Sequence, residues 1–453
     1  MLKQYKKLGS AIALSLMVSA ANAGVSPAEA AKIGTSLTPV GAEKAGNGGD
    51  IPAWDGGVTT PPAGYVVGSK HVNPFAADKV KFTITAANYK EYADKLSDGQ
   101  KAMFEKYPDT YRMPVYPTRR SSAYPQEIYD ASKKNATDTS LVEGGNGLNN
   151  YVNGVPFPIP ATGVEAIWNH IVRYRGGSVS RVIGQATPQA NGDYSIVRFK
   201  DEFTFRNKLT DFDPTKDANV LFYFKQDVVS PARLAGNVLL VHETLDQVKE
   251  PRKAWVYNAG QRRVRRAPQV SYDGPGTASD GMRTSDNLDM FNGAPDRYDW
   301  KLVGKQEMYI PYNSYNLNSG DLKYDDIIKA GHINQDHTRY ELHRVWKVEA
   351  TLKEGKRHIY GKRTFYFDED TWQATHIDHY DGRGQLWRVA EAHNLMFYDT
   401  LVPWYALETL YDLTSGRYLV LGLDNEDDGS YVYGFERTSG DYTPAALRRA
   451  GRR

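Results

Sequence analysis

The sequence after residue 178 is dominated by short runs of β-forming residues that are separated by turns. One group of runs covers 194–204, 220–225, 237–245, 253–257 and 263–267, and a second covers 339–352, 358–367, 373–380, 386–393, 407–412 and 418–423. Eleven such runs at regular spacing predict a mainly β protein of the α+β class. We expect one large curved antiparallel sheet or an open half-barrel.

Helices and extended chain are predicted mainly ahead of this sheet. Residues 35–68 are rich in Gly and Pro and show almost no periodicity, which indicates an extended N-terminal arm. Arm and helices together are predicted to wrap the body over residues 24–161. Residues 162–453 are predicted to form a lid helix and an open β-barrel with a long loop at 271–312, and 24–453 is expected to be one folded unit.

The lid helix is predicted to begin after Thr162. Thr162 and Glu165 have the spacing of a capping box, and Ile167, Trp168 and Ile171 lie on one apolar stripe. Such a stripe packs against a large apolar surface. We therefore expect this helix on the concave side of the sheet, with Trp168 either anchoring it there or lining a cavity.

The first 23 residues have the pattern of a Sec-type signal peptide. Lys3, Lys6 and Lys7 precede an apolar run at 11–20, and Ala21-Asn22-Ala23 supplies a small-residue cleavage site. The predicted signal peptide is therefore 1–23, with cleavage after Ala23 and a soluble periplasmic product. Because the chain has no cysteine, we expect neither disulfides nor a lipid anchor.

Charge gives no support to nucleic-acid binding. The 56 Lys and Arg residues fall to 53 when the three lysines of the predicted signal are removed, against 54 Asp and Glu. An exported chain that is nearly neutral lacks the basic surface that nucleic acid requires. The informative bias is instead towards aromatic residues, which make up 12% of the chain.

Several predicted strands are apolar on both faces, as at Val220 to Phe224. One explanation is a sheet buried on both sides by helices and the arm, and the other is a concave face that forms a hydrophobic cavity. The aromatic residues predicted to line such a cavity are Trp168, Trp255, Tyr257, Trp300, Trp346, Phe365, Phe367 and Trp387. Polar candidates for its mouth are Asn169, His170, Arg173, Arg263 and Arg265, although the run of arginines at 262–266 is more typical of a salt-bridged sheet edge.

Neither a metal site nor a catalytic motif is predicted. His376 and His379 are three residues apart in a strand and point to opposite faces, which leaves too few ligands on either face. His337, Glu341 and His343, and the aspartates of 271–312, do not match a known ligand spacing either. We predict no cofactor and no enzymatic activity, while paired carboxylates of an exported hydrolase acting on lipid or glycan stay an alternative.

Several longer motifs resemble a known family. They include Gly154-Val155-Pro156-Phe157-Pro158-Ile159-Pro160, Trp168-Asn169-His170-Ile171-Val172-Arg173-Tyr174-Arg175-Gly176, Phe291-Asn292-Gly293 and Asp296-Arg297-Tyr298-Asp299-Trp300. With these motifs the chain resembles the proteobacterial family known as domain of unknown function 1329. That resemblance implies a fold related to periplasmic outer-membrane lipoprotein-sorting proteins, in which helices plug the concave side of an open β-barrel.

The resemblance also implies a function. Members of the family are often encoded beside exporters of the resistance-nodulation-division class, which implies traffic of hydrophobic molecules between the two membranes. The hypothesis is a periplasmic carrier for a lipid or a lipoprotein acyl chain, with such an exporter or an outer-membrane protein as partner. A partner of an envelope export complex that binds no ligand is the remaining alternative. The family supplies no catalytic residues.

Overall fold

The computed structural model describes residues 24–268, 270–429 and 431–450. The predicted signal peptide lies outside these residues. Among the described helices, none is both long and apolar enough to cross a membrane.

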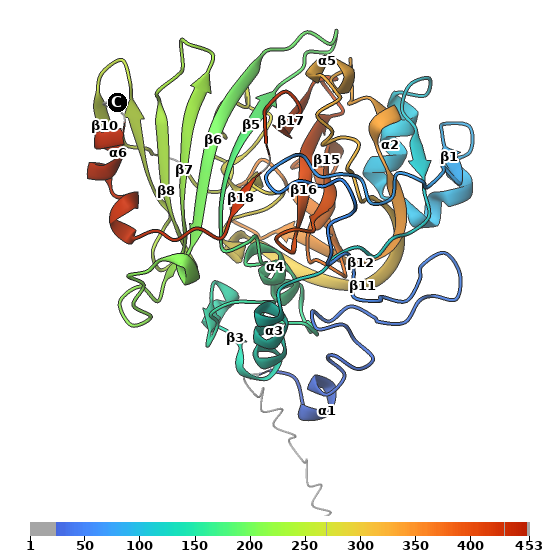
Figure 1. The fold of residues 1–453 in the computed structure, drawn as a ribbon, viewed down its shortest axis with the longest axis horizontal. Coiled ribbons are helices and arrows are strands. Elements are labelled where there is room, and N and C mark those ends of the chain that lie inside the picture. Colours follow the sequence, from blue (N-terminus) through green and yellow to red (C-terminus); the bar gives the residue numbers. More distant parts are fainter. Residues whose placement is uncertain (1–23, 269, 430, 451–453) are drawn as a thin grey trace, which may run out of the picture.

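The chain is organised around one sheet of sixteen strands that curves without closing into a barrel (Figure 1). One half consists of β5 (Ser178–Ala186), β6 (Ile196–Phe205), β7 (Val220–Ser230), β8 (Val238–Thr244), β9 (Lys253–Asn258) and β10 (Arg263–Arg266). The other consists of β17 (Tyr418–Leu423), β16 (Val402–Asp412), β15 (Leu386–Phe397), β14 (Ala374–Tyr380), β13 (Lys362–Asp368) and β12 (Tyr340–Leu352). The halves meet where β17 pairs with β5. This architecture confirms the predicted mainly β, antiparallel fold.

Shorter strands complete the edges. β11 (Tyr298–Pro311) pairs with β12, β2 (Met113–Val115) joins β12 in parallel and pairs with β1 (Phe82–Ile84), and β18 (Val432–Tyr433) pairs with β5. A separate ladder joins β3 (Ser140–Leu141) to β4 (Leu148–Asn149). The loop predicted over 271–312 is thus wrong in its last part, where β11 lies. Aromatic and aliphatic residues of β11 are spaced by Asp, Lys and Gly, which gives the segment a loop-like composition.

The predicted lid helix is α4 (Gly163–Ile171), and it begins with the predicted capping box. The Glu165 amide donates to Thr162 Oγ1 at 3.2 Å, and the Thr162 amide donates to Glu165 Oε2 at 3.2 Å. A Cβ at Gly163 would lie 2.8 Å from the backbone of Trp300, so only glycine lets the helix approach β11 this closely. Residues of α4 pack together with residues from both halves of the sheet, including Val241 and Phe365. The face that they share is therefore the inner, concave face.

Removing the cap gives a measurable loss of stability. Thr162→Ala is expected to lower the free energy of unfolding by about 1 kcal/mol, because the Glu165 amide loses its acceptor, Thr162 Oγ1. Urea denaturation of the variant measures the change. Thr162→Ser keeps the hydroxyl and is the control; an equal loss in both variants would contradict the role of the cap.

Two of the other helices lie on the outer face of the sheet. α2 (Asp98–Lys106) packs on β14 and β15, and α6 (Pro444–Ala450) packs on β8, β9 and β10, both on the outer face. The expectation that the helices lie on the concave side is correct for α4 and wrong for α2 and α6. The outer face also carries apolar side chains such as Val389 and Leu240, so it too needs cover. The remaining helices are α1 (Pro27–Ala30), α3 (Gln126–Asp138) and α5 (Tyr324–Ile327).

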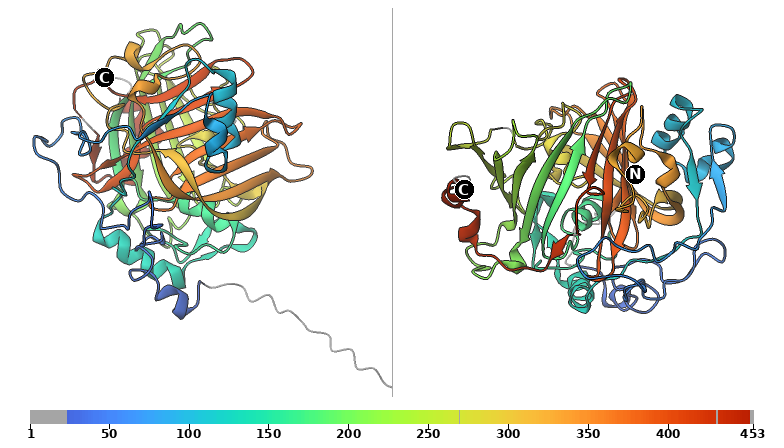
Figure 2. Two further views of the ribbon diagram at one scale, coloured as in Figure 1. Left: turned by 90° about the vertical axis from the view of Figure 1, so that its right-hand side faces the viewer. Right: turned by 45° about the horizontal axis from the view of Figure 1, so that its top comes forward.

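The N-terminal segment runs along the body as a long arm, as Figure 2 shows. Its contacts are polar and specific. The amide of Asn47 donates to Glu307 Oε1 at 2.7 Å, the Trp54 indole donates to the Ser122 carbonyl at 3.1 Å, and the Val58 amide donates to the Ser121 carbonyl at 2.8 Å.

Candidate ligand-binding cleft

The inner face of β7, β8, β9 and β10 is a regular floor of side chains. Antiparallel pairing places Gln226 opposite Leu239, Leu239 opposite Val256, and Val256 opposite Arg265. Residues that are directly opposite point to the same face. A neighbouring row runs from Phe224 through Val241 to Ala254 by the same pairing, so two mainly apolar rows lie side by side.

Residues 267, 268 and 270–288 form the roof above this floor. The roof is held by Asp286, which accepts from Thr284 Oγ1 at 2.6 Å and from Arg363 at 3.1 Å, and whose Oδ2 lies 3.1 Å from His358 Nε2. Burial opposes the charge of this carboxyl, but Arg363 and His358 hold the pKa of Asp286 well below its usual range.

Just beyond the roof, Asp289 ties the chain to the end of α4. Its carboxylate pairs with both Arg173 and Arg175, and it accepts from the Trp404 indole at 3.1 Å. The two arginines outweigh burial and hold the pKa of Asp289 well below its usual range. The roof is thus fixed at its C-terminal end by buried ion pairs.

Between floor and roof lies a cleft of about 270 Å³. Its lining is mostly apolar, with a small number of polar groups, which is the general character of a small-molecule site. The lining residues are Phe222, Phe224, Gln226, Leu239, Val241, Glu243, Arg252, Val256, Ala267, Pro268, Val270, Pro275, Gly276, Thr277, Arg283, Thr284, Ser285 and Leu288.

Two of the charged residues in the lining neutralise each other. Arg252 Nε lies 2.7 Å from Glu243 Oε2, and its other nitrogens donate to the carbonyls of Val270 and Asn292 at 2.8 and 2.7 Å. Glu243 also accepts from the amide of Asn292 at 3.0 Å. This pair connects the roof to the floor. Because its polar atoms already have protein partners, few of them can bind a ligand.

Four of the aromatic residues predicted to line a cavity lie elsewhere on the inner face. Trp300 and Phe365 pack against Phe291, with Phe291 and Phe365 ring centroids 5.6 Å apart, and Phe367 stacks on Phe365. Trp168 is buried on α4, and its indole donates to the Gly145 carbonyl at 2.9 Å. These residues fill the core beneath α4, and none is among the cleft lining.

The other four predicted aromatic residues are not part of the cleft lining either. Trp255 and Tyr257 are on the outer face of β9, in the cluster under α6. Trp346 stacks on Trp372 with centroids 6.0 Å apart, and the Trp387 indole donates to the Asp412 carboxylate at 3.0 Å. The structure thus does not gather the eight predicted aromatic residues into one cavity.

Three of the predicted polar residues connect α4 to its surroundings. The side chain of Asn169 exchanges two hydrogen bonds with the Phe157 backbone, at 2.7 and 2.9 Å. His170 Nδ1 accepts from the Ala374 amide at 3.0 Å, and burial lowers the pKa of His170 well below its usual value. With Arg173 bound to Asp289, all three are buried and engaged with protein partners.

Arg263 and Arg265 lie on β10, which is an edge strand of the sheet. Both are exposed. Because Arg265 pairs with Val256 of the cleft floor, and Arg263 is two residues away, both point towards the inner face beside the cleft. The run of arginines is therefore an exposed edge that also borders the cleft.

Sequence reasoning missed most of the cleft residues. The alternation at Phe222 and Phe224 was a usable signal, since it indicated a strand that is apolar on both faces. Arg283 gave no signal, because a single arginine in a loop rich in Gly, Asp and Ser has no pattern around it.

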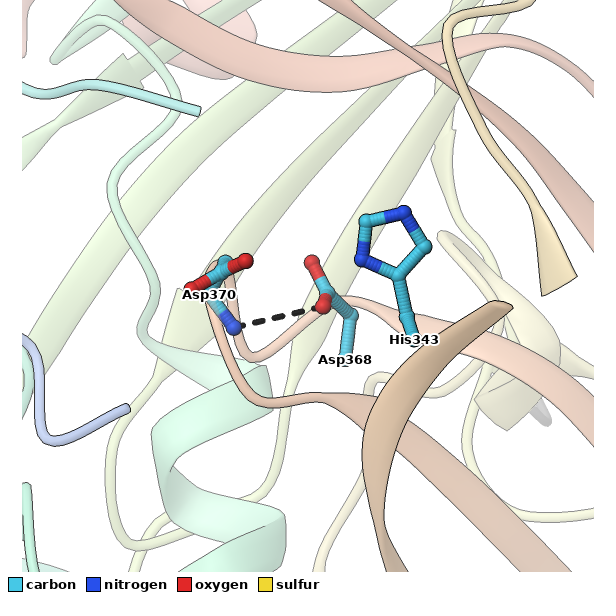
Figure 3. A group of neighbouring side chains, drawn as sticks. All are labelled: His343, Asp368 and Asp370. Carbon is cyan, nitrogen blue, oxygen red and sulfur yellow. Dashed lines mark hydrogen bonds between the residues drawn. The ribbon is translucent and has the colours of Figure 1, made fainter. Parts of the chain in front are cut away.

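A second polar group lies at the ends of β12 and β13, where His343, Asp368 and Asp370 converge (Figure 3). Their potential ligand atoms lie within 4.8 Å of one another. However, both oxygens of Asp370 accept from Arg120, at 2.9 and 2.6 Å, and Asp368 accepts from Thr371 Oγ1 at 2.7 Å. Arg120 thus already supplies the positive charge that a cation would bring.

A third polar group lies under α2, on the outer face. Ser97 Oγ lies 2.7 Å from His376 Nε2, and the Gly99 amide donates to Asp378 Oδ1 at 2.9 Å. His376 and Asp378 share a face, as predicted, and lie 2.8 Å apart. Serine and histidine are in contact, but both are buried and neither lines the cleft. The group holds the N-terminus of α2 on the sheet.

Known proteins resemble this chain over most of its length. The uncharacterised protein PA3922 of Pseudomonas aeruginosa is 66% identical over 441 residues, which is 97% of each chain. The crystal structure of a DUF1329 family protein of Desulfovibrio piger is 17% identical with a TM-score of 0.41, covering 60% of this chain and 92% of that one. A LolA superfamily protein of Nitrosomonas europaea is 12% identical with a TM-score of 0.37, covering 63% and 98%.

The family model described as protein of unknown function (DUF1329) matches residues 83–448. The match contains the sheet from β5 to β18 and the cleft, and it confirms the resemblance that the motifs had indicated. The chain belongs to the DUF1329 family.

Proposed function

We propose that the protein is a carrier that binds a hydrophobic or amphiphilic molecule in the cleft between the roof and strands β7, β8 and β9. The observation that carries this proposal is the mainly apolar lining of a cleft of about 270 Å³ on the inner face. Transfer of an apolar chain from water into such a site is favourable by about 0.8 kcal/mol per buried methylene. The ligand would be held by burial, and no bond would be made or broken.

The proposed site of action is the periplasm. This part of the proposal is supported by the sequence, through the signal pattern of residues 1–23 and the absence of cysteine. A carrier without a lipid anchor could move a lipid or acyl chain between an inner-membrane exporter of the resistance-nodulation-division class and the outer membrane.

Filling the cleft tests the proposal. Leu239→Trp places an indole over the floor and is expected to weaken binding of the neutral apolar probe N-phenylnaphthylamine at least about tenfold, or 1.4 kcal/mol. Fluorescence titration measures the affinity. Val248→Trp adds the same indole at an exposed position outside the cleft and should bind the probe like the wild type.

Two results would contradict the carrier. The first is a wild-type protein that binds no apolar probe and releases no apolar molecule on extraction with organic solvent. The second is equal affinity of wild type and Leu239→Trp for the probe, which would show that the probe binds outside the cleft.

A further inference from the structure

Arg283 is the one charged residue of the cleft lining whose guanidinium forms neither a hydrogen bond nor an ion pair within residues 24–268, 270–429 and 431–450. It is 8% exposed. Arg252, in the same lining, shows the usual state of a buried arginine, with an ion pair and backbone acceptors. A buried cation without such partners is costly.

The carboxyls that act electrostatically on Arg283 are Glu408 and Asp201, and neither forms an ion pair with it. Asp201 accepts from Gln226 at 3.0 Å and lies 3.4 Å from Arg181, so its carboxylate is already shared. Burial and the neighbouring Asp289 raise the pKa of Glu408 to about 8, so this carboxyl carries little charge at pH 7. The cleft therefore presents an uncompensated positive charge.

The position of Arg283 is set by a tight turn in the roof. Pro275 and Thr284 form a β-bridge, and the Gly276 amide donates to the Arg283 carbonyl at 2.8 Å. A Cβ at Gly276 would lie 2.9 Å from Arg283 Nε, so the glycine provides room for the side chain. The turn therefore fixes the backbone of Arg283, and Gly276 leaves room beside its side chain.

We infer that the cleft selects an amphiphile with one apolar chain and an acidic head group, carboxylate or phosphate, that accepts hydrogen bonds from Arg283. This inference rests on the proposed function and specifies its ligand class. The size of the cleft, about 270 Å³, is just below the range of roughly 300–1,000 Å³ for drug-sized ligands, which favours one chain over a two-chain lipid. The arginine geometry suits both head groups, since each can accept two parallel hydrogen bonds.

The test compares three probes with alkyl chains of the same length, namely dodecanoate, dodecyl phosphate and the neutral dodecanol. Each is titrated by calorimetry below its critical micelle concentration. Wild type is expected to bind at least one acidic probe ten- to a hundredfold more tightly than dodecanol, which is roughly the gain from hydrogen bonds to a charged group. Arg283→Met should abolish this preference and leave dodecanol affinity unchanged. The acidic probe that loses more affinity identifies the head group.

Controls separate the charge of Arg283 from its packing. Arg383→Met removes the same charge from an exposed turn and should keep the preference. Arg283→Lys keeps the charge but not the paired donors, and should retain part of the preference. Thermal unfolding should show Arg283→Met to be at least as stable as wild type, because an unpaired buried cation is removed.

The outcomes distinguish this inference from the proposed function. If wild type binds dodecanol and both acidic probes equally, or if Arg283→Met keeps the preference, the head-group inference is overturned while the carrier stands. If none of the three probes binds, the carrier proposal itself fails.

Discussion

Asp289→Ala is expected to lower the free energy of unfolding by about 3–5 kcal/mol, because it leaves two buried arginines without their shared anion. Arg173 and Arg175 follow directly after α4, and Asp289 follows directly after the roof of the cleft. One carboxylate thus connects the lid helix to the roof. Loss of the Trp404 hydrogen bond to the same carboxylate adds to the effect.

Urea denaturation monitored by tryptophan fluorescence measures this loss. Asp289→Asn should lose nearly as much stability as Asp289→Ala, since an amide cannot neutralise two cations. Asp299→Ala, at an exposed position on β11, should change stability by less than about 0.5 kcal/mol. A loss below 1 kcal/mol in Asp289→Ala would show that the arginines find other partners.

Stability is also expected to fall as pH rises from 6.5 to 9, by roughly 3–5 kcal/mol in total. Burial opposes the charge of His376, but Asp378 and Glu391 outweigh it and raise its pKa to about 9, from 6.5. Burial and Asp289 raise the pKa of Glu408 to about 8, from 4.5. Both groups hold a proton in the folded chain that the unfolded chain has released. Unfolding therefore releases protons in this range, and higher pH favours it.

His376 and Glu408 each change the stability over a different pH range. The contribution of His376 is complete below pH 6.5 and is lost as pH rises through 9. The penalty from Glu408 grows from pH 4.5 upwards and is complete above 8. Below pH 6.5 the trend reverses, because burial lowers the pKa of His170 and of His379 well below the usual value, and these histidines favour unfolding in acid.

Urea denaturation at half-unit steps from pH 5.5 to 9 measures the profile, with a maximum expected near pH 6.5. Glu408→Gln should raise stability at pH 8 by about 2 kcal/mol relative to its effect at 6.5, and so flatten the alkaline limb. Glu354→Gln, at an exposed turn, should leave the profile unchanged. Constant or rising stability between pH 6.5 and 9 would show that these groups titrate normally.

Local signals predicted local structure well. The capping box and apolar stripe after Thr162 identified α4, and alternating apolar runs identified eleven of the strands. The strand β5 was missed although it joins the two halves of the sheet. It contains Ser178, Ser180, Gly184 and Gln185, which weaken its apolar pattern, and neighbours on both sides bury it. Tertiary contacts, and not propensity, make that segment a strand.

The cleft was harder to predict than the fold. Sequence reasoning favoured large aromatic residues as cavity lining, yet a tryptophan is as useful for filling a core as for binding a ligand. Trp168 and Trp300 fill the core. What marks the cleft is Arg283, a buried arginine whose guanidinium forms no hydrogen bond or ion pair with the described residues. This becomes known only when the residues around it are placed in space.

The pairing of β17 with β5 has a consequence for the time at which the sheet can form. Val420 pairs with Ala186, about 230 residues earlier in the chain, so β5 lacks one neighbour until almost the whole polypeptide is available. Closing so long a loop is entropically costly and makes folding slow. The central sheet can therefore be completed only after the C-terminal strands have been synthesised.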